Sequence, residues 1–220
     1  MSDSLRTGDL SDQDSGPAAM PADNRRDTAR FALLIRPAKV VCGRLEYPCV
    51  MRDVSEEGIR IRLFHPLPDG SGYAIEMLGG ERYAIQPAWF NGLAAGFRFV
   101  EPVRLDRILA NAGPFPNRPV RLSIEFPATL ECGERKSAVT LNNLSQQGAR
   151  LTSADYLALG QLVALHSDCL PRIHAKVRWR KDDQYGVVFE ETFKLAELSG
   201  LAVGIYSSTS YREQAKLSAA

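Results

Sequence analysis

The sequence lacks the features that mark several large classes of protein. Its 220 residues contain no apolar run near the ~18–20 residues that a membrane-spanning helix needs. Its four cysteines form no CxxC pair and would stay thiols in a reducing compartment. No charge sign dominates, because 27 Lys and Arg stand against 26 Asp and Glu. A protein that coats nucleic acid needs a strongly basic domain, so an anionic partner here requires a local cluster of residues.

The two ends of the chain lack large apolar side chains. Residues 1–24 hold five aspartates and one arginine, a local charge of −4, and we expect a disordered acidic tail there. They also lack the basic start and apolar middle of a secretory signal, so we expect a cytoplasmic protein. Residues 206–220 are polar without helical periodicity, and we expect a second tail.

The chain contains an internal repeat with a shift of 90 residues. Residues 37–105 align with residues 127–195 without a gap. The only two tryptophans of the chain, Trp89 and Trp179, fall in register. Other identical pairs are Cys42 and Cys132, Ser55 and Ser145, Gly58 and Gly148, Arg60 and Arg150, Gly96 and Gly186, and Phe99 and Phe189. The repeat predicts two copies of one small domain.

Within each copy the apolar residues recur with a period of two. Ile59, Ile61 and Leu63 alternate with arginines, and short runs of this kind are separated by Gly, Pro and Asp turns. This pattern is typical of antiparallel strands in a small barrel. We therefore predict an all-β fold of two tandem small antiparallel β-barrels, each followed by a short helix. The predicted ranges are 25–112 and 118–205 for the domains, 113–117 for a Gly- and Pro-containing linker, and 103–112 and 193–201 for the helices.

Two motifs in the first copy point to function. Arg26 and Arg30 form an RxxxR pair, and Asp53-Val54-Ser55-Glu56-Glu57-Gly58 forms a [DN]xSxxG turn before the next strand. In order and separation these resemble the two signature motifs of the PilZ domain family. The tryptophan and the Gly-x-x-Phe strand of each copy resemble that family as well. The resemblance covers nearly all of residues 25–205, as two tandem PilZ-like domains.

The resemblance implies six-stranded barrels and, in a copy with both motifs, binding of the bacterial second messenger cyclic di-GMP. In such proteins the residue before RxxxR, here Arg25, influences how many ligand molecules stack in the site. The residues that the resemblance assigns to the ligand are Arg25, Arg26, Arg30, Asp53, Ser55 and Gly58, with Arg60 as an additional contact. An equally supported interpretation of Arg60 is a structural salt bridge, since Arg150 repeats it in the second copy.

The chemistry of these residues suits such a ligand independently of the resemblance. A guanidinium is a planar fork of donors that matches phosphate oxygens and the guanine O6/N7 edge. The carboxylate of Asp53 can accept from guanine N1–H and N2–H. Ser55 can donate to base or phosphate, or brace the turn. Gly58 would supply a positive φ or a close backbone approach.

The second copy keeps only the turn motif. Its segment Asn143-Leu144-Ser145-Gln146-Gln147-Gly148 has an amide where the first copy has a carboxylate. Pro116 and Val120 stand at the positions that correspond to Arg26 and Arg30. We interpret this copy as a degenerate PilZ-like domain that does not bind the nucleotide and has a structural or partner-facing role.

The sequence thus favours a non-enzymatic cyclic di-GMP receptor without a cofactor. Ligand would order the arginine arm, rearrange the two barrels and signal to an unidentified protein partner. The alternative is a protein-interaction adaptor of PilZ fold that no longer binds nucleotide, as the loss of one motif in the second copy suggests. An oligonucleotide-binding barrel needs aromatic residues interleaved with basic ones, and only Trp179 between Arg178 and Arg180 fits, so we do not expect nucleic acid.

We expect neither a metal site nor a catalytic site. His166, Cys169 and His174 form an H-x2-C-x4-H string, which we interpret as packing and surface residues. No Ser/His/Asp or Cys/His arrangement has supporting spacing.

Overall fold

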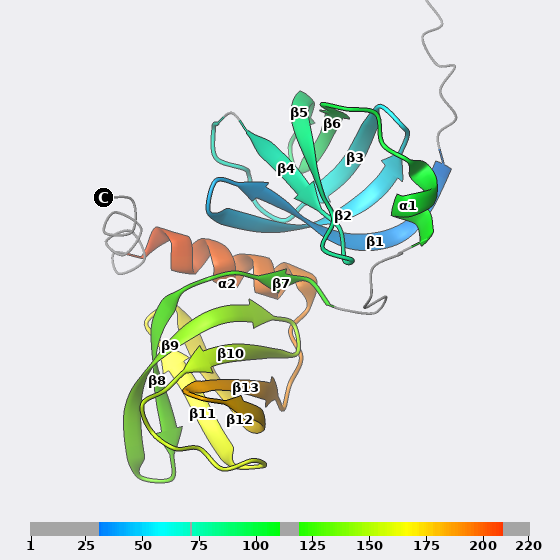
Figure 1. Ribbon diagram of the computed structural model, residues 1–220. Helices are drawn as coiled ribbons and strands as arrows, with labels where there is room; N and C mark the ends of the chain where they lie inside the picture. The colour runs from blue at the N-terminus through cyan, green and yellow to red at the C-terminus, as the bar shows by residue number, and fades with distance from the viewer. Residues whose placement is uncertain (1–30, 71, 111–118, 209–220) are drawn as a thin grey trace, which may run out of the picture.

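The computed structural model describes residues 31–70, 72–110 and 119–208 as two β-barrels with a helix between them (Figure 1). The first barrel is closed and antiparallel, with strand order β1-β2-β3-β6-β5-β4. Its strands are β1 (Phe31–Cys42), β2 (Leu45–Val54), β3 (Gly58–Leu63), β4 (Tyr73–Glu76), β5 (Arg82–Asn91) and β6 (Ala94–Phe99).

The second barrel repeats this topology. Its order is β10-β13-β12-β11-β8-β9, and β9 pairs back with β10 to close the ring, while β7 adds to the other edge of β9. The strands are β7 (Arg121–Leu122), β8 (Phe126–Cys132), β9 (Arg135–Ser145), β10 (Gly148–Thr152), β11 (Leu162–Ser167), β12 (Leu170–Lys181) and β13 (Gln184–Phe189). The predicted all-β fold of two tandem antiparallel barrels is confirmed.

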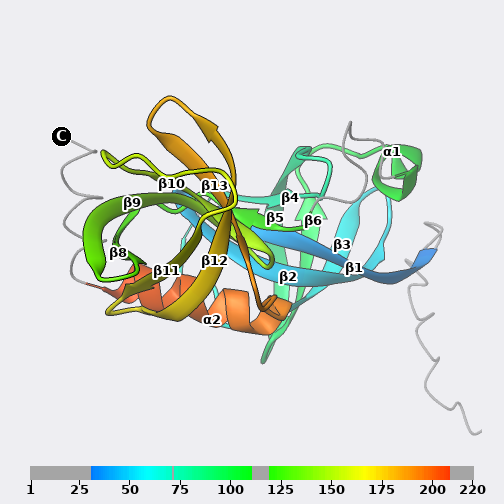
Figure 2. The same cartoon turned by 90° about the horizontal axis from the view of Figure 1, so that it is seen from below.

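The period-two pattern places the core inside each barrel. In β3, Ile59, Ile61 and Leu63 are buried, whereas Arg60 and Arg62 between them are exposed. Burial of a large aliphatic side chain stabilises the fold by roughly 1.5–3 kcal/mol, so the alternation fixes which face of the strand points inward. Figure 2 shows the strands of both barrels curving around their interiors.

The repeat extends to irregular details of the strands. The β5–β6 register shifts between Pro87 and Trp89, and the β12–β13 register shifts between Val177 and Trp179. In both barrels the shift places a tryptophan opposite a glycine of the next strand, Gly96 or Gly186. A Cβ at either glycine would overlap the indole. The repeated tryptophan and the repeated glycine are therefore packing partners within each barrel.

The two helices differ in length and position. The first, α1 (Leu105–Ala110), buries Ile108 and receives a hydrogen bond from Arg36 Nη1 to the Ile108 carbonyl at 3.2 Å. The second, α2 (Leu195–Ser207), begins where Lys194 N–H donates to the Glu197 carboxylate at 2.8 Å. No helix in the described part of the chain is long and apolar enough to cross a membrane.

Helix α2 extends further than the sequence pattern indicates. Tyr206, which we assigned to the polar tail, is the penultimate residue of the helix and is buried. The reason is tertiary: its hydroxyl accepts from Glu46 N–H at 3.0 Å and donates to the Glu46 carbonyl at 2.9 Å, and its ring packs edge-on against Tyr47. The helix of the second barrel thus packs on strand β2 of the first.

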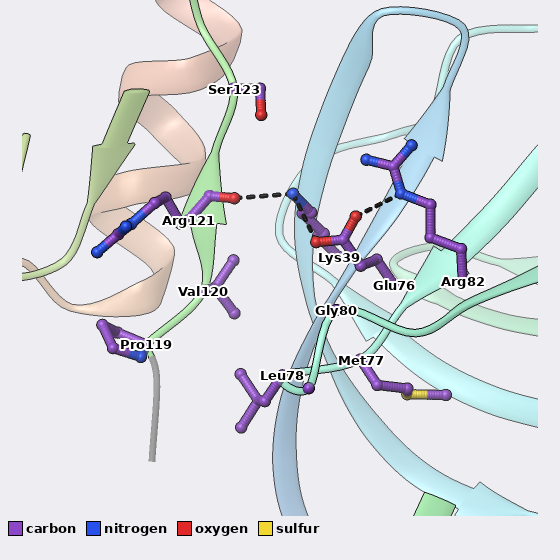
Figure 3. Close-up of a pocket in the computed structure, with 11 residues that line it drawn as sticks. Lys39, Glu76, Met77, Leu78, Gly80, Arg82, Pro119, Val120, Arg121 and Ser123 are labelled. Atoms are coloured by element: carbon purple, nitrogen blue, oxygen red, sulfur yellow. Dashed lines mark hydrogen bonds and ion pairs between the residues drawn. The ribbon is translucent and has the colours of Figure 1, made fainter. Parts of the chain in front are cut away.

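An ion cluster joins the barrels beside this helix (Figure 3). The buried ammonium of Lys39 lies 2.9 Å from the Glu46 carboxylate, 3.0 Å from the Glu76 carboxylate and 2.8 Å from the carbonyl oxygen of Arg121 on β7. The Glu46 carboxylate also accepts the N–H of Ser123 at 2.7 Å. Both charges of the Lys39–Glu46 pair are buried, and backbone groups of the second barrel satisfy part of their hydrogen-bonding capacity.

Several predicted segments lie outside the described residues. These are the acidic tail 1–24, the linker 113–117 and most of the tail 206–220. The four cysteines are free thiols, of which Cys49 is fully buried, and burial raises the pKa of that thiol.

Candidate ligand-binding site

The turn motif of the first copy joins β2 to β3. Asp53 is near the end of β2, Ser55 is in the turn, and Gly58 and Arg60 are in β3. The arginines expected to bind phosphate, Arg25, Arg26 and Arg30, lie outside the described residues. The structure thus brings together the Asp53, Ser55, Gly58 and Arg60 part of the predicted site.

A β-bulge positions Asp53. In the β2–β3 pairing Met51 lies opposite Ile61 and Asp53 lies opposite Arg60, so Arg52 is the extra residue. Such a bulge re-aims the side chains that follow it. The Asp53 carboxylate forms an ion pair with Arg60 Nη2 at 2.6 Å. The Asp53 side chain is 23% exposed and the Arg60 side chain is 55% exposed. The salt-bridge interpretation of Arg60 therefore describes this structure, and the guanidinium remains accessible.

Ser55 and Gly58 hold the turn itself. Gly58 N–H donates to Ser55 Oγ at 3.1 Å, and Ser55 N–H donates to the Gly58 carbonyl at 2.8 Å. Of the two roles suggested for Gly58, the structure shows the close approach and not a positive φ. A Cβ at this position would stand 2.8 Å from the carbonyl oxygen of Phe97 on β6. Glycine is therefore needed for β3 to pair with β6.

A surface hollow of about 730 Å³ lies beside the turn, which we call the Asp53 hollow. Its lining includes Asp53, Ser55, Arg60, Trp89, Phe97 and Arg98. The exposed Arg98 lies opposite Gly58 in the β3–β6 pairing and was missed by our sequence analysis. The one signal that could have found it is its place inside the Gly-x-x-Phe strand, between two inward-facing phenylalanines.

The second barrel has a smaller hollow at the equivalent place, about 280 Å³. There Asn143 is buried, and its side-chain oxygen accepts the N–H of Arg150 at 3.1 Å. Ser145 Oγ donates to the Gly148 carbonyl at 2.9 Å, as Ser55 braces its own turn. Pro119 and Arg121 also line the hollow. The turn is kept in both barrels, but here the amide serves the strand pairing.

Within the H-x2-C-x4-H string of the second copy, His166 contacts a carboxylate outside the string. His166 Nε2 lies 3.2 Å from the Glu131 carboxylate. Lys136 and Arg172 contact the same carboxylate, at 3.0 and 2.7 Å. Among residues 31–70, 72–110 and 119–208 there is no group of three His, Cys, Asp or Glu side chains that could hold a metal ion.

A known family model matches the sequence of the second barrel. The sequence model of the PilZ domain matches residues 117–200. This is the copy that our sequence analysis treated as degenerate, and the match spans β7–β13 and the start of α2. No curated protein sequence matches the chain.

Three of the solved structures to which this chain is similar have low sequence identity to it. PlzA of Borreliella burgdorferi, solved with c-di-GMP, is 11% identical, with 79% of this chain and 88% of that chain covered and a TM-score of 0.34. YcgR of Escherichia coli, also solved with c-di-GMP, is 12% identical, with 83% and 88% covered and a TM-score of 0.32. The motility inhibitor MotI/DgrA of Bacillus subtilis is 13% identical, with 84% and 99% covered and a TM-score of 0.32.

Proposed function

We propose that this tandem PilZ-domain protein is a cytoplasmic, non-enzymatic receptor for cyclic di-GMP, which binds over the Asp53 hollow of the first barrel. The observation that carries the proposal is a strand pairing. At its start β1 places Phe31 opposite Val54 and Ala32 opposite Asp53. Strand β1 therefore begins beside the [DN]xSxxG turn, and the proposal requires Arg30, the residue before Phe31, to reach the Asp53 hollow. This start of β1 supports the proposal that the arginine motif and the turn motif form one site.

The hollow offers complementary groups for the two kinds of chemistry in the ligand. Arg26 and Arg30 would bind the phosphates, and the Asp53 carboxylate would accept N1–H and N2–H of a guanine. For this, Arg60 must release at least part of its contact with Asp53, and its 55% exposure leaves it room to turn toward a phosphate or a base. Ser55 and Gly58 keep the turn in shape while this exchange takes place.

Strand β1 would transmit binding to the second barrel. Its first residues pair beside Asp53, and Lys39 on the same strand forms the ion cluster with Glu46 and the Arg121 carbonyl. Binding that orders residues 25–30 would pull on the start of this strand. We propose that the pull changes the angle between the barrels and so alters the surface offered to a protein partner.

Isothermal titration with cyclic di-GMP tests the proposal, with GTP and cyclic AMP as ligand controls. We expect binding to the wild type and a loss of at least about tenfold, ~1.4 kcal/mol, for Arg26→Ala and for Arg30→Ala. Arg62→Ala is the matched control, because Arg62 is an exposed arginine on the same strand as Arg60 and does not line the hollow. Unchanged affinity in both test variants would remove the proposed site.

An interaction adaptor without nucleotide binding is the second candidate. The Asp53–Arg60 contact at 2.6 Å favours it, since the carboxylate already has a partner within the protein. The adaptor predicts no heat in the titration together with a stable protein partner in a pull-down. A receptor predicts the opposite result: heat in the titration, and a protein partner that binds only when cyclic di-GMP is present.

A further inference from the structure

Strand β12 carries a row of exposed cations on the second barrel. Lys176, Arg178, Arg180 and Lys181 are all exposed, within six consecutive residues. Their positions in the first barrel, 90 residues earlier, hold Gln86, Ala88, Phe90 and Asn91. Since the first barrel closes with the same topology and no charge at these positions, the fold does not require the four cations.

Large apolar side chains are exposed beside these cations. Tyr156, Leu159 and Leu162, on the segment that leads into β11, are 71%, 67% and 62% exposed. Trp179 of β12 is 42% exposed. Isolated exposed apolar residues are ordinary in soluble proteins, but four of them next to four cations form a patch of mixed character.

Contacts between the two groups show that they form one surface. Gly160 N–H donates to the Val177 carbonyl at 2.8 Å, and Leu162 pairs with Lys176. The guanidinium of Arg180 stacks over the ring of Tyr156, with its central carbon 4.6 Å from the ring centroid. The segment 156–162 therefore runs alongside residues 176–180, and we call residues 156–162 and 176–181 the β12 surface. Two of its residues, Arg178 and Trp179, also line the hollow of the second barrel.

We propose that the β12 surface binds the headgroup region of an anionic phospholipid bilayer. Cations near an anionic leaflet are attracted to it, and Trp and Tyr favour the boundary between headgroups and acyl chains. Leu159 and Leu162 would enter the acyl boundary, where aliphatic side chains gain from burial. A nucleic acid is a poorer fit, because leucine side chains neither stack on bases nor donate hydrogen bonds to them.

Charge limits the extent of the surface. Asp182 and Asp183 are exposed at the β12–β13 turn and would be repelled by the same leaflet. The contact is therefore expected to centre on residues 156–162 and 176–181, with the turn pointing away from the bilayer. This proposal does not depend on the Asp53 hollow, which belongs to the other barrel.

Vesicle co-sedimentation of the full chain tests the proposal. We compare vesicles of phosphatidylcholine alone with vesicles that also contain phosphatidylglycerol. The expected result is binding to the anionic vesicles only, weakened by added salt because the Debye length shortens. The variant Lys176→Gln/Arg180→Gln/Lys181→Asn, which borrows the first barrel's residues at two positions, should lose at least about tenfold in affinity. These three residues do not line either hollow.

Two further variants separate charge from insertion. Leu159→Ser/Leu162→Ser should also weaken binding to anionic vesicles, since it removes the apolar contact and no charge. Arg62→Gln/Arg104→Gln/Arg135→Gln removes three exposed cations elsewhere, so it should bind like the wild type. Equal binding by all variants would overturn the proposal. So would binding to duplex or single-stranded DNA that the β12 variant abolishes, in the absence of vesicle binding.

Discussion

The Asp53 carboxylate and the Arg60 guanidinium meet at 2.6 Å on the rim of the Asp53 hollow. At the equivalent place in the second barrel, Asn143 is buried and accepts the backbone N–H of Arg150 instead. The Asp53 side chain at the end of β2 is thus partly exposed at the surface. The Asn143 side chain near the end of β9 is buried and hydrogen-bonds within the β9–β10 pairing. The two copies share a turn and differ in what its first side chain can offer a ligand.

Asp53→Asn, which copies the second barrel, should weaken cyclic di-GMP binding by at least about tenfold, because a neutral amide is a weaker acceptor for two guanine donors. The stability of the barrel should change by less than about 1 kcal/mol, since the Arg60 partner is largely solvent-exposed. Titration calorimetry and urea unfolding measure the two effects separately. A stability loss that accounts for the whole affinity change would contradict a direct role for the carboxylate.

Gly58→Ala should destabilise the first barrel by about 1–3 kcal/mol, because its Cβ would stand 2.8 Å from the Phe97 carbonyl oxygen and both strands would have to move. Gly204→Ala is the matched control of opposite sign. A Cβ there meets no atom within 4 Å, and alanine in the interior of a helix is favoured over glycine by about 1 kcal/mol. Urea unfolding of both variants tests the pair; two shifts of the same sign would contradict the explanation.

Lys39→Met should cost about 3 kcal/mol or more in unfolding free energy. The change removes the cation between the Glu46 and Glu76 carboxylates, and it leaves the buried Glu46 charge with only the exposed Arg82 guanidinium at 3.6 Å and the N–H of Ser123. Arg104→Gln breaks an ion pair with Asp106 whose side chains are 72% and 63% exposed, and it should leave the unfolding free energy almost unchanged. Thermal or chemical denaturation provides the comparison. Similar losses in the two variants would mean that Lys39 contributes no more than a surface charge.

The contribution of Glu131 to the stability of the second barrel should be lost in acid. A hydrogen bond from Lys136, helped by the charges of Arg172 and His166, holds the pKa of the Glu131 carboxyl below its usual range. A lowered folded-state pKa contributes stability above the ordinary glutamate pKa of ~4.3 that is lost as the pH falls through the lowered value. The stability difference between wild type and Glu131→Gln should therefore shrink over that window. Glu134→Gln, at an exposed hairpin position, controls for the loss of one negative charge.

The sequence predicted the barrels because their causes are local. Strand β3 alternates Ile59, Ile61 and Leu63 with arginines, and a period of two needs no knowledge of the rest of the chain. The repeat also matched Trp89 with Trp179 and Gly96 with Gly186, but only the strand pairings show that each tryptophan lies opposite the glycine of its own barrel.

Features that depend on distant partners could not be predicted in this way. Nothing near Tyr206 in the sequence indicates its contact with Glu46, which is 160 residues away. The sequence pattern therefore predicts a helix that ends at residue 201, whereas α2 ends at Ser207. The choice of Arg60 between a ligand and Asp53 depends on a bulge that moves the register by one residue. The roles expected of Arg25, Arg26 and Arg30 stay predictions, since these residues lie outside the described part of the chain.

The contact between Tyr206 and Glu46 has a consequence for dissecting this protein. Because α2 follows the second barrel in sequence yet covers β2 of the first, a fragment that stops between the barrels would expose Tyr47 and the backbone of Glu46 to water. Such a half-molecule would invite self-association through that uncovered edge. Studies of the N-terminal half in isolation would then report on an aggregating fragment, and the intact chain is the unit on which ligand affinities should be measured.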